Sequence, residues 1–399
     1  MRIGLITGEF PPMQGGVGAF TERLAKSLCT LGHEVHVISR RQTRPQLEDG
    51  QRPGLGQLRE PVKVSWGVLH PVARRWGWSD VARIAQIALR YELEVLDVQY
   101  QAAAYNMHSP AINLGPWRLK GLAATVVTFH DLRVPYLFPK AGPLRRYIVR
   151  LAAQKSHGVI VTNGADRRVV EGWLKDKGRV AEIPIGSNVQ VHDAGKEVVA
   201  QARRDLRLAD DAFLLGYFGF LNESKGADNL VQALASQPPN VHLVFIGGRT
   251  GSSDQKNNER FVASVEELAH SLRLAERVHW TGFLPDDRLS ALMRAVDLMV
   301  LPYRDGVSLR RGTLMAALAH GRPIISTRPD GDVSAFAHGE NIWLAGRDDV
   351  QALATAIDTL RQDEPLRNRL AHGARQLAAT FSWESIARRT VAFFEALGA

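Results

Sequence analysis

The sequence contains almost no cysteine and no long apolar run. Its single cysteine, Cys29, excludes a disulfide framework and a cysteine-based zinc site, and such usage is typical of the reducing cytosol. Because Cys29 falls within an apolar helical pattern, we expect it in the core. No window of about 20 apolar residues occurs, which argues against a membrane-spanning segment. The first residues, MRIGLITGEFPP, lack the apolar stretch of a signal peptide, and we expect a cytoplasmic protein.

The composition is that of a folded protein with more than one domain. Hydrophobic residues make up 45% and charged residues 23% of the 399 positions, which excludes a disordered or fibrous chain. This length exceeds one ordinary core, so two domains of about 150–200 residues are expected. There is no fixed-period repeat and no low-complexity tract, and the segment 41–61, rich in Gln, Gly, Pro and Arg, is interpreted as a mobile loop.

Short apolar runs alternate with amphipathic stretches, a pattern typical of parallel sheets covered on both faces by helices. Strands are expected near 2–7, 34–38, 94–98, 124–129, 157–161, 213–218, 241–246, 277–280, 297–301 and 323–326. Helices are expected near 17–31, 143–155, 226–236, 257–272 and from 348 onward, with a polar linker near 186–211. The pattern predicts an α/β protein with two tandem Rossmann-like, doubly wound domains facing a central cleft.

Positive charge is concentrated in the first half of the chain. The whole sequence carries a net charge of +9 and has a pI near 9.8. Residues 1–190 hold 26 basic and 15 acidic side chains, whereas residues 191–399 hold 24 and 26. We therefore expect the first half to meet an anionic partner.

Two glycine-containing loops connect an apolar strand to a helix. In GEFPPMQGGVGAF, Gly15 and Gly16 lie where a helix begins, so backbone N–H groups and the helix dipole can hold an anion. The third glycine of a dinucleotide fingerprint is absent, and a tight turn without a ligand fits equally well. In GFLNESKGADNL, Lys225 stands at a helix start, where its ammonium can meet a diphosphate; a solvated lysine is the plainer alternative.

A third loop, within PYRDGVSLRRGTLMAALAHGRPIIST at 302–327, carries three arginines beside the start of a short helix. Arg310 and Arg311, followed by Gly312, can clamp a diphosphate in bidentate fashion, and Arg304 is nearby. The alternative is a solvated basic turn whose adjacent arginines point apart. The position of the loop after a strand of the second sheet favours the phosphate interpretation.

These three loops, in this order, resemble those of the two-domain GT-B glycosyltransferases, in particular the retaining family 4 that includes many bacterial sugar transferases. The resemblance covers nearly the whole chain. Its most specific part runs from TGFL at 281–284 to ALAHG at 317–321. Weaker parts are the Gly-Gly turn, TFHD at 128–131, IPIGSN at 183–188 and GFLNESKG at 219–226.

The sequence departs from the family pattern at charged positions. The family carries Arg and then Lys at the first phosphate loop of the second domain, whereas here Phe220 takes the Arg position and only Lys225 matches. The family also has two glutamates eight positions apart, the second of which holds the donor ribose hydroxyls. Ser308 and Ala316 occupy those two positions here. We hypothesise that the adjacent arginines of the third loop supply the missing positive charge.

The resemblance implies a role for each domain and for named residues. Domain 1–190, with a helix at 383–399 packing back on it, is expected to bind the acceptor, and domain 191–382 the nucleotide sugar. The expected donor-binding residues are Gly15, Gly16, Gly219, Lys225, Gly282, Phe283, Leu284, Asp305, Ser308, Gly312 and Thr313. His130 is expected to contact the donor sugar or its phosphate, and His130 and Asp131 are the expected acceptor-binding residues, with Asp131 positioning the acceptor. The expected catalytic residues are His130, Lys225, Arg310 and Arg311.

The expected chemistry needs no metal, because cationic side chains and a helix start can stabilise the leaving diphosphate. The segment Asp330-Gly331-Asp332 matches a D-x-D metal motif, but it lies in a Pro-Asp-Gly sequence and is interpreted as a turn. Retention of stereochemistry follows from the resemblance. The sequence identifies no carboxylate nucleophile.

A stretch without acidic residues lies between Asp131 and Asp166, and its basic residues are Arg133, Lys140, Arg145, Arg146, Arg150 and Lys155. Within 143–155 one helical face carries Leu144, Ile148, Leu151 and Ala152, with the arginines off it. This pattern fits a basic amphipathic helix that meets an anionic acceptor or an anionic membrane surface, and it equally fits an ordinary surface helix.

Trp76 and Trp78, beside Arg74 and Arg75, are candidates for an interfacial anchor or for walls of the core or of an acceptor pocket. No helix-turn-helix, aromatic RNA platform or zinc module is present, so a nucleic-acid partner is not expected.

We therefore expect a glycosyltransferase that uses a nucleotide-sugar donor, no cofactor and a sugar, lipid-linked or other anionic acceptor, with peripheral contact to the inner face of the membrane. Three alternatives stay open. The first is a non-catalytic partner or activator on the same fold, which the absent glutamates favour. The others are a sugar-nucleotide epimerase and a nucleic-acid or membrane-surface binding module.

Overall fold

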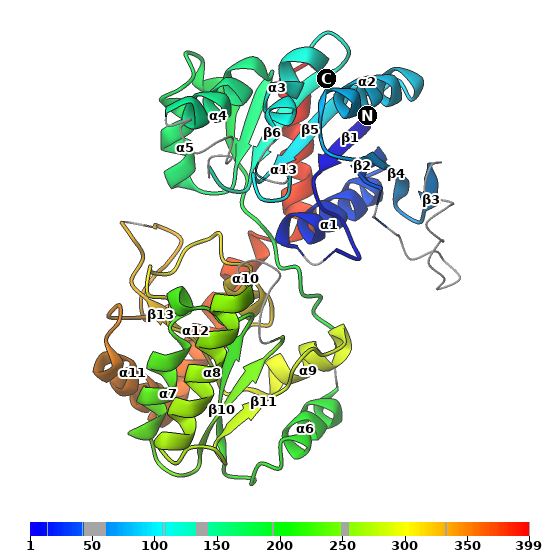
Figure 1. Cartoon of the computed structure of the whole chain (residues 1–399). Helices are drawn as coiled ribbons and strands as arrows, with labels where there is room; N and C mark the ends of the chain where they lie inside the picture. Colours follow the sequence, from blue (N-terminus) through cyan, green and yellow to red (C-terminus); the bar gives the residue numbers. More distant parts are fainter. Residues whose placement is uncertain are drawn as a thin grey trace. The chain divides into compact units, whose positions relative to one another are not determined.

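The computed structural model describes residues 1–13, 15–41, 43, 61–105, 107, 109–132, 143–193, 195–248, 255–331 and 333–398. The chain divides into two compact units, each with its own sheet and its own apolar core (Figure 1). Unit 1 contains Met1–Gly186 and Trp383–Ala399, and unit 2 contains Ser187–Ser382. Within the described residues, every helix is too short or too polar to cross a lipid bilayer.

Unit 1 is built on an eight-stranded sheet with the order β3-β4-β2-β1-β5-β6-β7-β8. All neighbouring strands are parallel except β3 and β4 at one edge. The strands are β1 (Arg2–Thr7), β2 (Glu34–Arg40), β3 (Val62–Val64), β4 (Gly67–Ala73), β5 (Val95–Tyr100), β6 (Ala124–Phe129), β7 (Gly158–Val161) and β8 (Val180–Glu182). The central strands are continuous apolar runs because helices cover both faces of the sheet.

The helices of unit 1 are α1 (Gly16–Thr30), α2 (Trp78–Arg90), α3 (Pro110–Leu119), α4 (Pro143–Lys155), α5 (Gly164–Glu171), the 3-10 helix η2 (Lys177–Arg179) and α13 (Trp383–Ala396). Leu5 of β1 packs with Phe20 of α1 and Phe394 of α13 on one face of the sheet. Ile6, the next residue, belongs to the core on the other face with α2, α3, α4 and α5. Helix α13, red in Figure 1, therefore completes unit 1 although it ends the chain.

Unit 2 is built on a six-stranded, all-parallel sheet with the order β11-β10-β9-β12-β13-β14. The strands are β9 (Phe213–Phe218), β10 (Val241–Ile246), β11 (Val278–Trp280), β12 (Leu298–Leu301), β13 (Ile324–Thr327) and β14 (Trp343–Ala345). The helices are α6 (Lys196–Asp205), the 3-10 helix η3 (Glu223–Lys225), α7 (Ala227–Ala235), α8 (Gln255–Ser271), α9 (Asp286–Ala295), α10 (Gly312–Ala319), α11 (Val350–Gln362) and α12 (Glu364–Ala379).

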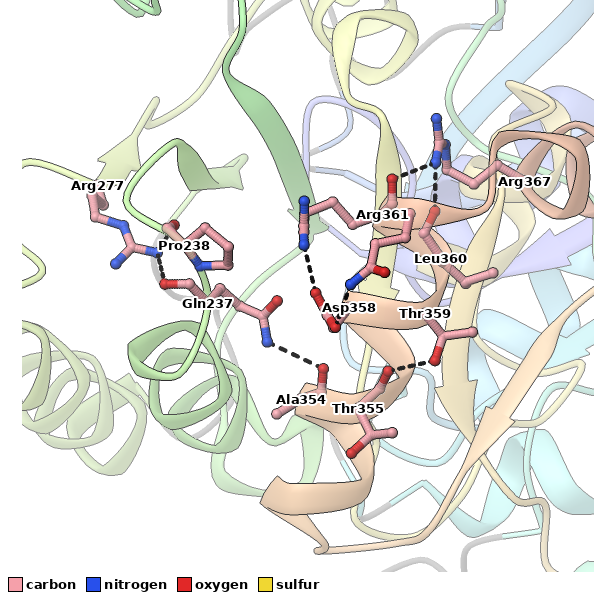
Figure 2. A network of polar contacts seen from close by, with 11 residues as sticks. Gln237, Pro238, Arg277, Ala354, Thr355, Asp358, Thr359, Leu360, Arg361 and Arg367 are labelled. Atoms are coloured by element: carbon pink, nitrogen blue, oxygen red, sulfur yellow. Dashed lines mark hydrogen bonds and ion pairs between the residues drawn. The ribbon is translucent and has the colours of Figure 1, made fainter.

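A polar network joins α7 and β10 to α11 in unit 2 (Figure 2). The guanidinium of Arg277 donates to the carbonyl oxygens of Val241 at 2.9 Å and Pro238 at 3.0 Å. The side chain of Gln237 donates to the carbonyl oxygen of Ala354 in α11 at 3.1 Å (Figure 2). Arg277 thereby ties the turn after α7 to β10, where the carbonyl of Pro238 also accepts from the backbone N–H of Val241 at 3.0 Å, and Gln237 ties the same turn to α11.

The predicted α/β class with two doubly wound parallel sheets is confirmed. The predicted linker near 186–211 is wrong in part, because α6 forms there. Helix α6 buries none of its own residues, and Arg203 anchors it by donating to the carbonyl of Ala295 and the carboxylate of Asp297, at 2.9 and 3.1 Å. Its few apolar residues, among them Val199 and Ala202, are only half-buried, and a stretch of mainly polar composition does not by itself indicate a helix.

Strand β4 is not predicted by the sequence because Pro71 lies inside it, and proline disfavours a strand interior. The structure accommodates this proline with a register shift between β2 and β4 next to its partner Ser39. The loop predicted at 41–61 lies almost wholly outside the described residues. The predicted cleft depends on how the two units are placed relative to one another, and it stays a prediction.

Candidate functional site

In unit 2, three of the predicted donor-binding residues meet at the carboxyl ends of β9 and β12. Gly219 follows β9 with φ of +110°, and a Cβ atom there would lie 2.4 Å from Cγ2 of Thr313 and 3.6 Å from Nζ of Lys225. The structure therefore brings Gly219, Lys225 and Thr313 together, and only glycine allows this close approach. Nζ of Lys225 donates to the carbonyl oxygen of Phe220 at 2.6 Å.

A second cation, Arg311, lies beside this lysine. Its guanidinium stacks over the ring of Tyr303 at 4.5 Å and pairs with Asp305. Burial and the charge of Arg311 lower the pKa of Lys225 to about 8. The hydroxyl of the buried Tyr303 is 2.6 Å from Oγ1 of Thr313, which orients the start of α10. A bound anion that reaches both groups would meet both positive charges and, at Arg311, would compete with the carboxylate of Asp305.

The other arginines of the third loop are placed differently. Arg304 is neutralised by Asp228 at 2.7 Å and by Asp348 at 2.8 Å, so it ties the loop to the rest of unit 2. This finding corrects the grouping of Arg304 with the phosphate-facing arginines. Arg310 is exposed, whereas Arg311 is half-buried against Tyr303.

The remaining predicted donor residues of unit 2 lie on loops around this edge. Gly282 has φ of +65° and forms an isolated bridge with Gly247 after β10, and Phe283 beside it is 82% exposed. Leu284 and Ser308 are half-buried, Gly312 is exposed and Ala316 is fully buried in α10. Asp330 of the D-x-D segment pairs with Arg347 at 3.6 Å, and Asp332 lies outside the described residues.

In unit 1, His130 follows β6 and ends a chain of buried polar groups. Its Nε2 is 2.9 Å from Oε1 of Gln99, whose Nε2 donates to the carboxylate of Asp97 at 2.6 Å. The hydroxyl of Thr128 donates to the same carboxylate at 2.8 Å. Burial raises the pKa of Asp97 to about 7 and lowers the pKa of His130 to about 3, so the histidine ring is neutral. Phe20 packs edge-on against this ring at 4.7 Å.

The turn before α1 binds an anion supplied by the chain itself. The carboxylate of Glu9 accepts from the backbone N–H groups of Val17 at 3.0 Å and Gly18 at 3.3 Å. A Cβ atom on Gly15 would collide with this carboxylate at 2.1 Å. These N–H groups are thus already paired, and the donor contact predicted for Gly15 and Gly16 themselves stays a prediction.

Two cavities open on the helical face of unit 1. One, of about 710 Å³ between α4 and α5, is lined by Leu132, Arg146, Tyr147, Val149, Arg150, Asp166, Val169 and Trp173. The other, of about 560 Å³ between α2 and α3, is lined by Trp78, Val81, Ala82, Ala85, Trp117, Arg118 and Leu119. Asp131, next to Leu132, accepts from Nε2 of Gln101 at 3.2 Å.

The helix predicted at 143–155 is present, but its buried face differs from the prediction. Ile148, Val149, Ala152 and Ala153 are buried, whereas Leu144 is 44% exposed. The shift by one residue follows from packing against α3, which a helical projection of α4 alone does not contain. Arg133 and Lys140 lie outside the described residues. Of the two tryptophans considered, Trp76 is fully buried and Trp78 is 51% exposed.

Asp97, Gln99, Glu9 and Tyr303 are not among the site residues predicted from the sequence. A signal was available for the first two, since VLDVQY places two polar residues two positions apart in an otherwise apolar strand. Such residues share one face of a strand and need buried partners. Glu9 and Tyr303 gave no comparable signal, because their partners are brought to them by the folding of loops.

The fold and the site together define a two-domain α/β enzyme with cationic and polar groups at the carboxyl ends of its strands. Comparison with known proteins identifies the family. Residues 14–191 match the family described as Glycosyltransferase Family 4, and residues 198–377 match Glycosyl transferases group 1. The chain therefore belongs to the GT-B glycosyltransferases, and both the predicted resemblance and the enzyme class are confirmed.

Similar proteins span the whole chain. D-inositol 3-phosphate glycosyltransferase of Corynebacterium urealyticum is 26% identical over 435 positions, covering 100% of this chain and 96% of that protein. The protein of that name from Corynebacterium diphtheriae is 28% identical, covering 98% and 93%. Among solved structures, Anabaena HepE in complex with UDP has a TM-score of 0.74 at 20% identity, covering 99% of this chain and 100% of that one. Sucrose-phosphate synthase from Thermosynechococcus elongatus has a TM-score of 0.73 at 20% identity, covering 100% and 99%.

Proposed function

We propose that this glycosyltransferase takes a sugar from a nucleotide-sugar donor bound by unit 2 and transfers it to an anionic acceptor bound by unit 1. The observation that carries the proposal is the pair of adjacent cations, Lys225 and Arg311, at the carboxyl ends of β9 and β12. HepE, a structural neighbour, was solved with UDP and with UDP-glucose, which supports a nucleoside diphosphate sugar as the donor.

The two cations have a direct role in this chemistry. As the bond from the sugar to the diphosphate breaks, negative charge builds on the leaving phosphate, and Lys225 and Arg311 stabilise it. Arg311 takes over from the arginine that family members carry at the position of Phe220. Side chains supply this charge, so we propose transfer without a metal. In family members a glutamate binds the ribose hydroxyls of the donor, and Ala316 at that position cannot make this contact. The donor is therefore held mainly through its phosphates and its sugar.

We propose that His130 contacts the transferred sugar or its phosphate and that Asp131 positions the acceptor hydroxyl. Membership in family 4 supports retention of the anomeric configuration, and the sequence identifies no carboxylate as the nucleophile.

Donor binding and turnover test the proposal. A nucleotide sugar that raises the melting temperature of the protein identifies the donor. Lys225→Met and Arg311→Met should each weaken its binding by about tenfold or more, since each removes a charge-assisted contact. Lys196→Met and Arg288→Met, on exposed helix surfaces of unit 2, are the matched controls. Epimerised donor formed without an acceptor would select the epimerase alternative, and wild-type protein without donor-dependent product would select the non-catalytic one.

The acceptor would lie in the 710 Å³ cavity. Arg146 and Arg150, one helical turn apart on α4, line it together with apolar walls, and Leu132 connects it to Asp131. The curated relatives are named for D-inositol 3-phosphate, which supports a phosphorylated acceptor. Arg146→Gln with Arg150→Gln should raise the acceptor KM and leave donor affinity unchanged. Lys63→Gln, on β3 at the opposite edge of the sheet, is the control.

Peripheral contact with an anionic membrane would use the 560 Å³ cavity between α2 and α3. Trp78 and Trp117 are each about half exposed there, and Arg118 lies at its rim. Amphipathic tryptophan rings with adjacent cations suit a lipid headgroup layer. Wild-type protein should sediment with vesicles containing anionic phospholipid but not with neutral ones, and Trp78→Ala with Trp117→Ala should abolish the effect. Equal recovery with both vesicle types would contradict it.

A further inference from the structure

We infer that Asp97 and Gln99 are positioning residues for His130: they fix its single ring proton on Nε2 and leave Nδ1 to accept a hydrogen bond from a hydroxyl of the bound sugar. The inference rests on the proposed function, because it assumes that His130 contacts the sugar. It assigns a role to two residues of β5 that act through His130 and do not themselves contact the substrate.

Strand pairing brings the three residues together. Asp97 and Gln99 alternate along β5 and so share one face of the strand. In the parallel pairing of β5 with β6, Gln99 lies opposite Thr128, two residues before His130. The backbone N–H of His130 donates to the carbonyl of Tyr100 at 3.0 Å, which fixes the start of the loop after β6. The imidazole is thereby held against the side chain of Gln99.

The direction of each hydrogen bond follows from the chemistry of the groups. An ionised carboxylate can only accept, so Asp97 takes hydrogen bonds from the hydroxyl of Thr128 and from the amide nitrogen of Gln99. With its nitrogen turned to Asp97, the amide of Gln99 presents its oxygen to His130, 2.9 Å from Nε2. An oxygen at this distance requires N–H on Nε2.

Because the ring of His130 is neutral, it carries one N–H, and a proton on Nε2 leaves Nδ1 unprotonated. Nδ1 has no hydrogen-bond partner among the residues that the structure describes. An unprotonated nitrogen can accept from a sugar hydroxyl, whereas the opposite tautomer would present an N–H to it. The chain from Asp97 thus determines which kind of group His130 can bind.

The buried carboxylate sets the condition for this arrangement. Burial raises the pKa of Asp97 to about 7, and hydrogen bonds from Thr128 and Gln99 oppose that rise. At pH 8 the carboxylate is ionised, so it accepts hydrogen bonds from Thr128 and Gln99 and the amide oxygen of Gln99 faces His130. Titratable groups near Asp97 include His130 and the buried Tyr105, whose hydroxyl donates to the carbonyl oxygens of Ile6 and Gln99. Tyr105 in turn lies within electrostatic reach of Tyr100, Arg40 and Glu9.

The tautomer of His130 can be measured directly on the full chain without any substrate. Long-range proton–nitrogen NMR spectra of ¹⁵N-histidine-labelled protein at pH 8 should show His130 with its proton on Nε2. His320 is an internal reference, because its Nδ1 lies 2.7 Å from the carbonyl oxygen of Ala316 and must carry the proton. A wild-type His130 protonated on Nδ1 would overturn the inference.

Variants then test the role of each group. Asp97→Asn can donate to the oxygen of Gln99, which turns the amide around and should move the proton of His130 to Nδ1. Gln99→Leu removes the acceptor at similar volume and should give a mixture of tautomers. Thr128→Val is the matched control, since it removes a hydrogen bond to Asp97 but keeps the contact between Asp97 and Gln99. It should keep the wild-type tautomer.

Turnover connects the tautomer to the reaction. Asp97→Asn and Gln99→Leu should lower kcat by about tenfold or more, with a much smaller change in donor KM, because a wrongly presented nitrogen acts mainly in the transition state. A changed tautomer with wild-type kcat would overturn the positioning role. A wild-type protein that transfers no sugar would contradict the proposed function. If its NMR spectrum still shows the expected tautomer, the failure lies with the function and not with the positioning of His130.

Discussion

Lys225 and Arg311 carry like charges at the carboxyl ends of β9 and β12, and the charge of Arg311 adds to burial in lowering the pKa of Lys225 to about 8. This relationship makes donor binding depend on pH. Only the protonated lysine attracts a diphosphate, so affinity should be constant below the pKa and fall above it. We expect roughly a tenfold loss per pH unit once the pH exceeds about 8.

Calorimetric titration with the donor between pH 6.5 and 9.5 measures this slope. Lys225→Arg keeps a positive charge throughout that range and should bind with nearly constant affinity. If Lys225→Arg shows the same decline as the wild type, another group is responsible.

Phe220 and Arg311 should be coupled if the arginine replaces the charge missing at position 220. Arg311→Met should weaken donor binding by about tenfold or more, and Phe220→Arg, introduced into that variant, should restore part of it. Phe220 is 42% exposed, so the new side chain has room. Donor dissociation constants for the wild type, both single variants and the double variant give the coupling. If the effects of the two substitutions on the free energy of donor binding are simply additive, Arg311 does not substitute for the missing charge at position 220.

His70 should make the protein sensitive to acid. It is 1% exposed, lies 2.9 Å from Nδ1 of the equally buried His36, and burial with the nearby charges lowers its pKa to about 3. In the unfolded chain its pKa is about 6.5, so the unfolded state binds more protons as the pH falls from 6.5 towards 3. The free energy of unfolding should therefore fall in this window, by about 2 kcal/mol at pH 5 from this residue.

Urea unfolding at pH 7.5 and pH 5 tests the acid effect. His70→Phe should reduce the loss of stability between the two values, whereas His372→Phe, at an exposed position, should not. An identical pH dependence in wild type and His70→Phe would show that other groups control acid unfolding.

Arg277 should stabilise unit 2 through the network of Figure 2. Arg277→Met removes the guanidinium hydrogen bonds to the carbonyl groups of Val241 and Pro238 and should lower the free energy of unfolding by about 1–3 kcal/mol. Arg277→Lys should recover little, because one ammonium cannot reach several carbonyls at once. Arg273→Met, at an exposed position, is the control. Equal denaturation midpoints for Arg277→Met and Arg273→Met would exclude this role.

The sequence predicted most of the fold because parallel strands covered on both faces must be continuous apolar runs. RIGLIT and FLLGYF form β1 and β9 as expected. It missed elements whose stability comes from elsewhere in the chain. Helix α6 is held by Arg203, and β4 contains a proline that its neighbour β2 accommodates.

The sequence by itself determined the fold class, the family and the loops that carry Gly219, Lys225 and Arg311, because these depend on local composition and on order along the chain. Only the tertiary structure decided what each charged or polar group pairs with. Arg304 is neutralised by two aspartates, Glu9 caps the helix start beside Gly15, and Gln99 connects His130 to Asp97. These partners are distant in sequence, and their hydrogen bonds form only after the sheets have brought them within reach.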